Sequence, residues 1–286
     1  MQRVIGFAIA LFISCILSSA AVAAPKSFTV VVSGGGKGAP VILIPGLACG
    51  GAVWDATVAR YRAHHELHVL TLAGFAGTTA TDGPLLPAVR AELATYIREH
   101  ALRKPIVVGH SLGGFVALSL AATEPDLLGG VVVVDALPFF AATFDPNATE
   151  ASVKPKAEMM RQMLVGATPA AFAAQNRMAL TTMITDPKNI EPIAAMGKAT
   201  NPKAAATAVY EMMTTDLRPQ LAKIRVPVLV LAAGQGEPAA DTAKAYEAQY
   251  ASLPHHRVVV AEKSRHFIML DDPQLLFAQL DRELGQ

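Results

Sequence analysis

The sequence predicts an α/β fold in which a mostly parallel central sheet carries helices on both faces. Short apolar runs rich in Val, Ile and Leu alternate along the chain with longer segments whose apolar residues recur at helical spacing. The short runs are almost continuously apolar, which is typical of strands buried on both faces. With 286 residues, of which 52% are hydrophobic, the chain is long enough for one large core that also carries an insertion.

The N-terminal segment is typical of a secretory signal peptide, which we expect over residues 1–23. Arg3 supplies a positive start, residues 4–17 are apolar, and Ala21-Val22-Ala23 matches a small-residue cleavage site. The alternative is an uncleaved membrane anchor, because the apolar stretch over residues 4–24 approaches the length that spans a bilayer.

Cleavage would start the mature chain near Ala24 and leave Cys49 as its only cysteine. We therefore expect an exported protein, periplasmic or secreted, without an internal disulfide and without stable membrane association.

The core is expected in two parts, residues 24–138 and residues 218–286. The segment Gly34-Gly35-Gly36-Lys37 lacks the spacing of a phosphate-binding loop, and we interpret it as a hairpin turn between the first two strands. The predicted strands cover residues 28–32, 40–44, 68–72, 105–108, 131–134, 226–231 and 257–261. The predicted helices cover residues 86–102, 115–122, 239–250 and 273–284.

A helical cap is expected over residues 139–217, because this interval contains helix formers and no convincing strand. Helices are predicted at 158–164, 169–183 and 203–213, separated by prolines at 155, 187, 192 and 202. The interval is rich in methionine, which suits a pliable apolar pocket, although filling a helical core is the interpretation we favour for most of these side chains.

The most informative motif is Gly109-His110-Ser111-Leu112-Gly113, which lies between a predicted strand and a predicted helix. A serine hydroxyl becomes a useful nucleophile when a sharp strand-to-helix turn exposes it beside a base and backbone N–H donors. The two glycines leave room for such a turn. We interpret Ser111 as a nucleophile on this turn.

Together with two further motifs, this turn resembles the α/β-hydrolase family over essentially all of the mature chain. The run Ile44-Pro45-Gly46-Leu47-Ala48-Cys49-Gly50 resembles the family's oxyanion loop, although the usual His-Gly is replaced by Pro45-Gly46. The run Ser264-Arg265-His266-Phe267 resembles its late histidine loop. The resemblance implies Ser111 as nucleophile, His266 as base, and the backbone N–H groups of Leu47 and Leu112 as the oxyanion hole.

Two carboxylates match positions where family members carry the acid of the triad. Asp135 directly follows the apolar run 131–134, whereas Glu237 lies in Gly234-Gln235-Gly236-Glu237 after a later strand. A carboxylate behind four valines needs a partner, which favours Asp135 as first choice and keeps Glu237 as second.

The resemblance and the serine nucleophile imply hydrolysis of a small-molecule carboxylic ester, and the cap composition favours an apolar substrate. The alternative is a hydrolase-like protein that binds a small ligand with little or no turnover. A net charge of +1 gives no reason to expect a nucleic-acid partner. No metal and no cofactor is expected, because the sequence lacks the histidine and cysteine spacings of a zinc site.

Overall fold

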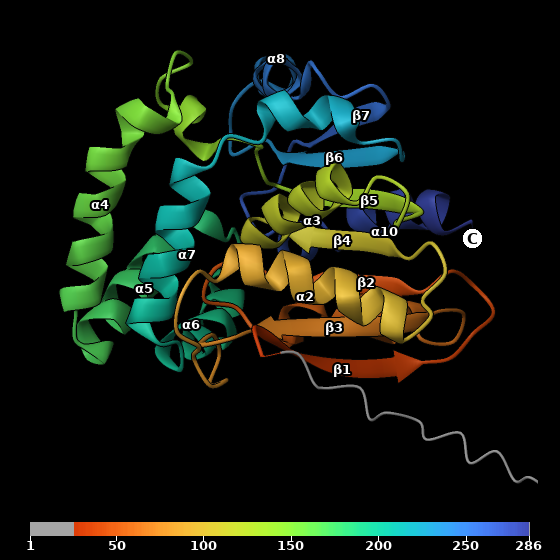
Figure 1. Cartoon of the computed structure of the whole chain (residues 1–286), viewed down its shortest axis with the longest axis horizontal. Helices are drawn as coiled ribbons and strands as arrows, with labels where there is room; N and C mark the ends of the chain where they lie inside the picture. Colours follow the sequence, from red (N-terminus) through yellow and green to blue (C-terminus); the bar gives the residue numbers. More distant parts are fainter. Residues whose placement is uncertain (1–25, 286) are drawn as a thin grey trace, which may run out of the picture.

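The computed structural model describes residues 26–285 and confirms the α/β fold (Figure 1). Within these residues a seven-stranded sheet has the order β1-β3-β2-β4-β5-β6-β7. All neighbouring strands are parallel except β1, which is antiparallel to β3. The strands are β1 Phe28–Gly34, β2 Val41–Ile44, β3 Glu66–Leu72, β4 Ile106–His110, β5 Gly130–Val134, β6 Val228–Ala233 and β7 His256–Ala261.

The predicted signal peptide, residues 1–23, lies outside the described residues. Between residues 26 and 285, no helix combines the length and the apolar composition needed to cross a bilayer.

The predicted hairpin between the first two strands is wrong. β3 lies between β1 and β2, so the glycine-rich segment joins strands that are not neighbours. Gly34 has φ +86°, and a side chain there would meet the carbonyl oxygen of His65 at 2.3 Å. The glycines therefore allow the chain to pass close to the start of β3, a long-range contact that the local pattern does not reveal.

Helices cover both faces of the sheet, and each face has its own hydrophobic cluster. One face packs against α2, α3 and α8, and the other against α1, α9 and α10. These helices are α1 Asp55–Tyr61, α2 Leu86–Glu99, α3 Leu112–Thr123, α8 Ala239–Tyr250, α9 Ile268–Asp271 and α10 Pro273–Leu284. The sequence did not predict α1, and α3 begins three residues earlier than expected, directly after Ser111.

Between β5 and β6 the chain forms the helices that we call the helical insertion, residues 140–214. In Figure 1 these helices lie at the edge where the parallel strands end. They are η2 Phe140–Thr143, α4 Glu150–Gly166, α5 Pro169–Met183, η3 Pro187–Asn189, α6 Ile190–Lys198 and α7 Pro202–Thr214, and η4 Arg218–Lys223 follows them before β6.

Helix α4 is longer than predicted because it continues through Pro155. Its start is stabilised by a capping box, in which the Thr149 hydroxyl accepts from the Ser152 N–H and the Ser152 hydroxyl accepts from the Thr149 N–H. The carbonyl freed by the proline belongs to Ala151, which is exposed, so water can satisfy it. An exposed helix therefore tolerates a proline that the sequence pattern predicts as a boundary.

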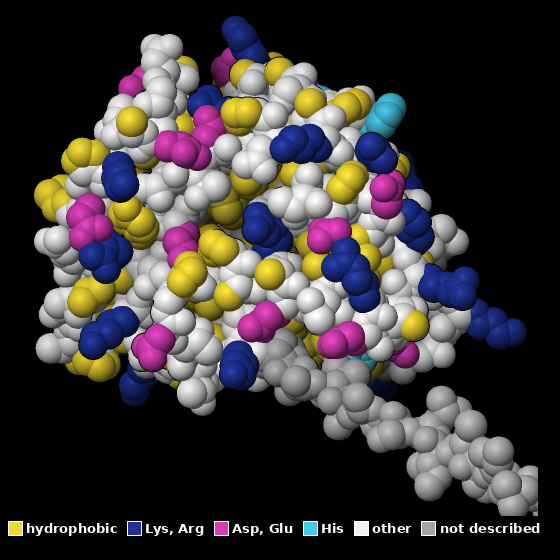
Figure 2. Space-filling view, viewed as in Figure 1, with side chains coloured by type: hydrophobic (Ala, Val, Ile, Leu, Met, Phe, Trp, Pro, Cys, Tyr) yellow, Lys and Arg dark blue, Asp and Glu magenta, His cyan; other side chains and the backbone are white. Residues whose placement is uncertain are grey.

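The insertion also contradicts the core-filling interpretation for half of its eight methionines. Met159, Met163, Met178 and Met183 are exposed, by 65%, 57%, 76% and 37%. Only Met213 is buried, and the other three are half-buried. Figure 2 shows apolar side chains on the surface over the α4 end of the molecule. The insertion is too thin to bury both faces of its outer helices.

Candidate active site

Ser111 occupies the sharp turn between β4 and α3. Its backbone has φ 51° and ψ −119°, a left-handed conformation that side chains rarely adopt and that is found at strained functional turns. A Cβ atom at Gly109 would lie 2.3 Å from the carbonyl oxygen of Gly113. Glycine at position 109 is therefore required for the helix to start so close to the strand.

The register of the sheet places the C-terminal ends of β4 and β5 side by side. His110 of β4 is paired with Val134 of β5, so Ser111 and Asp135 leave adjacent parallel strands at the same level. The Ser111 N–H donates to the Val134 carbonyl over 2.9 Å, which extends the pairing into the turn.

Asp135 and His266 are joined by a hydrogen bond of 2.6 Å, in which His266 Nδ1 donates to Asp135 Oδ2. Asp135 is 5% exposed. Its other oxygen, Oδ1, accepts from the Ala233 N–H at 2.8 Å and from the Tyr246 hydroxyl at 2.6 Å. Burial would raise the pKa of the Asp135 carboxyl, but the hydrogen bonds from His266, Tyr246 and Ala233 together hold that pKa below its usual value.

Glu237 is not part of this arrangement. It lies in the loop after β6, its side chain is exposed, and its carboxylate bonds to no described residue. Only its backbone is held, through an N–H bond of 2.9 Å to the Gly234 carbonyl. Of the two carboxylates left open by the sequence, the structure brings Asp135 to His266 and leaves Glu237 outside.

His110 connects the turn to the loop that carries His266. Its Nε2 atom lies 3.0 Å from the His266 carbonyl oxygen, and the two rings are 4.7 Å apart between centroids. Burial, with a smaller contribution from His266, lowers the pKa of His110 to about 3, so its ring is neutral near pH 7. A neutral ring that donates from Nε2 holds the backbone of His266 next to the residue before Ser111.

The early loop after β2 packs directly on the turn. A Cβ atom at Gly46 would lie 2.8 Å from His110 Nδ1 and 3.2 Å from Ser111 Cβ. A Cβ atom at Gly113 would lie 2.3 Å from the Ile44 carbonyl oxygen. These approaches bring Leu47, which follows Gly46, into the neighbourhood of Ser111.

The two expected oxyanion donors have N–H groups that the fold leaves available. Leu112 is the first residue of α3, so its N–H has no partner within the helix. The Leu47 N–H donates to no other group between residues 26 and 285. Cys49 in the same loop is buried, and burial raises the pKa of its thiol to about 12, which leaves it protonated and a poor nucleophile.

Apolar side chains of the insertion pack over Leu47. The cluster consists of Ala157 from α4 with Val209 and Met213 from α7, and partly buried side chains adjoin it. Those adjoining side chains are Leu47, Phe140, Met160, Leu164 and Tyr210. The loop after β2 is therefore covered by an apolar surface built from two helices of the insertion.

Two polar connections tie the insertion to the loops of the site. The buried Thr200 hydroxyl accepts from the Ala76 N–H at 3.0 Å and lies 3.4 Å from the Ala48 carbonyl oxygen. On the other side, the Arg265 guanidinium donates to the carbonyls of Thr181 and Ile184 at the end of α5. The sequence did not predict the roles of Thr200, Arg265 or Tyr246, because each bonds to a partner distant in the sequence.

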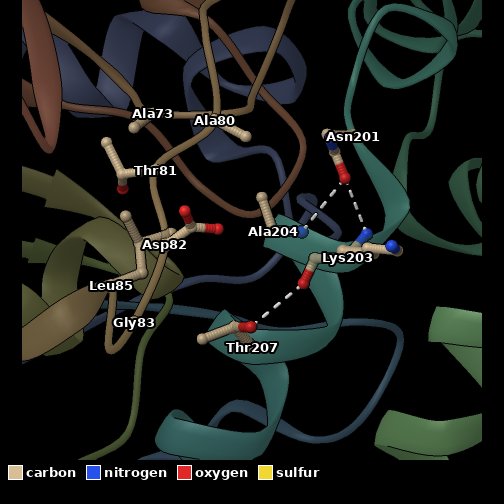
Figure 3. Close-up of a pocket in the computed structure, with 10 residues that line it drawn as sticks. All are labelled: Ala73, Ala80, Thr81, Asp82, Gly83, Leu85, Asn201, Lys203, Ala204 and Thr207. Atoms are coloured by element: carbon tan, nitrogen blue, oxygen red, sulfur yellow. Dashed lines mark hydrogen bonds between the residues drawn. The ribbon is translucent and has the colours of Figure 1, made fainter.

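The pocket drawn in Figure 3 is a separate feature. It encloses about 190 Å³ between the loop after β3 and the start of α7, and it contains none of the residues described above. Asn201 caps α7 beside it by accepting from the Lys203 and Ala204 N–H groups. Among residues 26–285, no group of three or more His, Cys, Asp or Glu side chains is arranged to hold a metal ion.

Comparisons with known proteins bear on the family and the fold. A model described as "Alpha/beta hydrolase family" matches residues 41–280. A pimeloyl-[acyl-carrier protein] methyl ester esterase of Vibrio vulnificus is 29% identical over 201 residues, which cover 68% of this chain and 75% of that protein.

Solved structures share the fold at low sequence identity. A hydrolase from Pseudomonas aeruginosa superposes with a TM-score of 0.76 at 21% identity, covering 91% of this chain and 94% of that one. The enol-lactonase from Burkholderia xenovorans superposes with a TM-score of 0.75 at 17% identity, covering 91% and 96%.

Proposed function

The chain belongs to the alpha/beta hydrolase family, and on this premise we propose that it hydrolyses carboxylic esters with Ser111 as the nucleophile. The observation that carries the proposal is the 2.6 Å hydrogen bond from His266 to the buried Asp135, formed on a loop that His110 anchors to the serine turn. This combination of nucleophile, oriented imidazole and carboxylate is the arrangement that acyl transfer requires.

The proposed reaction proceeds through an acyl-enzyme. Ser111 Oγ forms a bond to the ester carbonyl carbon while its proton passes to His266 Nε2. The N–H groups of Leu47 and Leu112 stabilise the negative oxygen of the tetrahedral intermediate. The intermediate collapses by breaking the bond to the alcohol oxygen, which takes the proton from His266. Water then repeats these steps and releases the acid.

Asp135 has a separate part in this sequence of steps. By accepting from Nδ1, it keeps His266 in the tautomer whose Nε2 can take the serine proton, and it stabilises the imidazolium that forms. Its lowered pKa means that the carboxylate is ionised throughout the neutral range, as this role needs.

We infer that the substrate is small to medium in size and apolar near the scissile bond, with the helical insertion acting as a cap. Support comes from the cluster of Ala157, Val209 and Met213 that covers the oxyanion loop. The similarity to a relative named as a methyl ester esterase and to a structure named as an enol-lactonase agrees with ester chemistry.

The proposal is tested by hydrolysis of p-nitrophenyl esters of increasing acyl length, with purified protein and its Ser111→Ala variant side by side. We expect turnover by the parent protein and none by Ser111→Ala. We also expect a burst of p-nitrophenol at high enzyme concentration and a kcat/KM that falls as the acyl chain becomes long. Absence of turnover on every ester by a folded protein would contradict the proposal and favour the ligand-binding alternative.

We also propose that the protein is exported after removal of residues 1–23. The support is the sequence pattern of that segment, with its apolar run and small-residue cleavage site. N-terminal sequencing of the protein from the producing cell tests this. A start near Ala24 is the expected result, and an intact Met1 in a membrane fraction would contradict it.

A further inference from the structure

The carboxylate of Asp135 receives a hydrogen bond from a side chain that the mechanism above does not use. The Tyr246 hydroxyl, on α8, donates to Asp135 Oδ1 over 2.6 Å. The same oxygen accepts from the Ala233 N–H at 2.8 Å, while among residues 26–285 Oδ2 accepts only from His266. The two oxygens therefore have different partners. Oδ1 accepts from Ala233 and Tyr246, and Oδ2 accepts from the imidazole of His266.

Two donors on Oδ1 determine the orientation of the carboxylate. Rotation about the Cβ–Cγ bond would break both bonds to Oδ1 of a carboxylate that is only 5% exposed, where a lost hydrogen bond is costly. The Ala233 N–H alone is a single contact about which the group can tilt. The added phenol defines the plane of the carboxylate and hence the direction in which Oδ2 points.

We propose that Tyr246 is a positioning residue for the ester hydrolysis proposed above, holding Asp135 so that Oδ2 orients His266 toward Ser111. The inference rests on that proposed function, and it adds a fourth side chain to the three that carry the chemistry. The Tyr246 hydroxyl bonds to Asp135 and not to Ser111, so its effect passes through Asp135.

The charged and titratable groups around Asp135 come from several elements. His266 approaches from the loop after β7, His110 from the end of β4, and Tyr246 and Tyr250 from α8. His110 is neutral near pH 7, and burial followed by the Asp135 charge raises the pKa of both tyrosines, so they are protonated. Of the two phenols, only that of Tyr246 donates to the carboxylate.

Tyr250 supplies a matched control. It lies one helical turn further along α8, is fully buried, and its hydroxyl donates at 2.8 Å to the Ala136 carbonyl, next to Asp135 in the chain but not to its carboxylate. Tyr246→Phe and Tyr250→Phe therefore each remove one hydroxyl and one hydrogen bond from the same helix, at a half-buried and a fully buried residue. A purely structural role predicts the same outcome for both variants.

The kinetic test measures kcat, KM and the pH dependence of kcat/KM for both variants on the best p-nitrophenyl ester. We expect Tyr246→Phe to lower kcat about tenfold with little change in KM, because only the transition state needs the oriented imidazole. The acidic limb of the kcat/KM profile of Tyr246→Phe should move to higher pH. Loss of the Tyr246 donor leaves more negative charge on Oδ2, which faces His266. Tyr250→Phe should keep kcat and the pH profile within about twofold of the parent. Equal kinetics in the two variants would overturn the proposal.

A second measurement does not depend on turnover. Proton NMR of the short His266–Asp135 bond should give a deshielded Nδ1–H resonance, assigned by its loss in Asp135→Asn. We expect this resonance to be unchanged in Tyr250→Phe and to shift and exchange faster with water in Tyr246→Phe. An identical resonance in both variants would overturn the positioning role. If the parent protein hydrolyses no ester but the resonance responds as expected, the proposed function has failed and the role of Tyr246 has not.

Discussion

The end of the sheet that carries Ser111 and the helical insertion that covers it differ in how closely their atoms are packed. At the serine turn, backbone atoms approach so closely that a methyl group at Gly109 or Gly113 would lie 2.3 Å from a carbonyl oxygen. In the insertion, α4 and α5 expose methionines by as much as 76%. The sheet end has no room for a side chain at these glycines, whereas the outer helices carry exposed side chains that can be substituted.

This difference matches the two tasks of a hydrolase. Proton transfer and oxyanion binding depend on atoms held to within a fraction of an ångström, which strand ends and helix starts can provide. Admission of substrates requires only an apolar surface of suitable width, which flexible thioethers can provide. The two regions meet at Thr200 and Arg265, so the insertion is nevertheless attached to both loops of the site.

The largest effect should come from the sheet end. Asp135→Asn should lower kcat/KM about ten-thousandfold, because the amide favours the wrong tautomer of His266. Glu237→Gln, the control on the exposed loop, should remain within about twofold of the parent. Steady-state kinetics on one ester checks both, and a large loss in Glu237→Gln would reverse the assignment of the acid.

A pH effect on stability should also arise at the sheet end. The pKa of His110 is about 3 when folded against 6.5 ordinarily, so the folded protein binds fewer protons than the unfolded chain between these values. The stability associated with neutral His110 is present above pH 6.5 and is lost as pH falls toward 3, by up to about 1.4 kcal/mol per pH unit.

His110→Gln keeps a donor for the His266 carbonyl but cannot be protonated. Urea unfolding at pH 7 and pH 4.5 should therefore show a smaller loss of unfolding free energy for this variant than for the parent. His68, whose pKa burial also lowers, is present in both proteins and cancels in the comparison. Equal losses of unfolding free energy in the parent and the variant would show that protonation of His110 does not cause the loss of stability at acidic pH.

A variant in the insertion should change selectivity rather than chemistry. Val209→Ala removes two methyl groups, which enlarges the apolar space next to Leu47, and should raise the ratio of kcat/KM for hexanoate over acetate esters by about tenfold. Val89→Ala in α2 removes the same atoms from the buried core below the sheet and should leave the ratio unchanged. An unchanged ratio in Val209→Ala would mean that this cluster does not contact the acyl chain.

The smallest effect is expected on the outer surface of the insertion. Met178→Gln should change the free energy of unfolding by less than about 0.5 kcal/mol, because the side chain is 76% exposed. Met213→Gln, at 4% exposure, should cost about 3 kcal/mol by burying an amide among apolar side chains. Chemical denaturation of both variants measures the difference.

Much of this architecture could be predicted without the structure because it depends on local patterns. Apolar runs predicted each strand, and α8 and α10 have the predicted bounds. Proline after a capping residue, as in Thr168-Pro169 and Asp272-Pro273, marks where α5 and α10 begin. The glycines around Ser111 indicated the turn because a close approach of backbone excludes any other residue there.

The sequence by itself therefore determined the α/β fold, the turn at Ser111 and a choice of two carboxylates. Only the tertiary structure decided that Asp135 is the one joined to His266, across 131 residues of chain, and that Tyr246 holds its other oxygen. It also decided that β3 separates β1 from β2 and that half of the insertion's methionines face solvent. The physical reason is that spacing along the chain reports local periodicity, whereas these features depend on which distant segments share a sheet edge or a buried space.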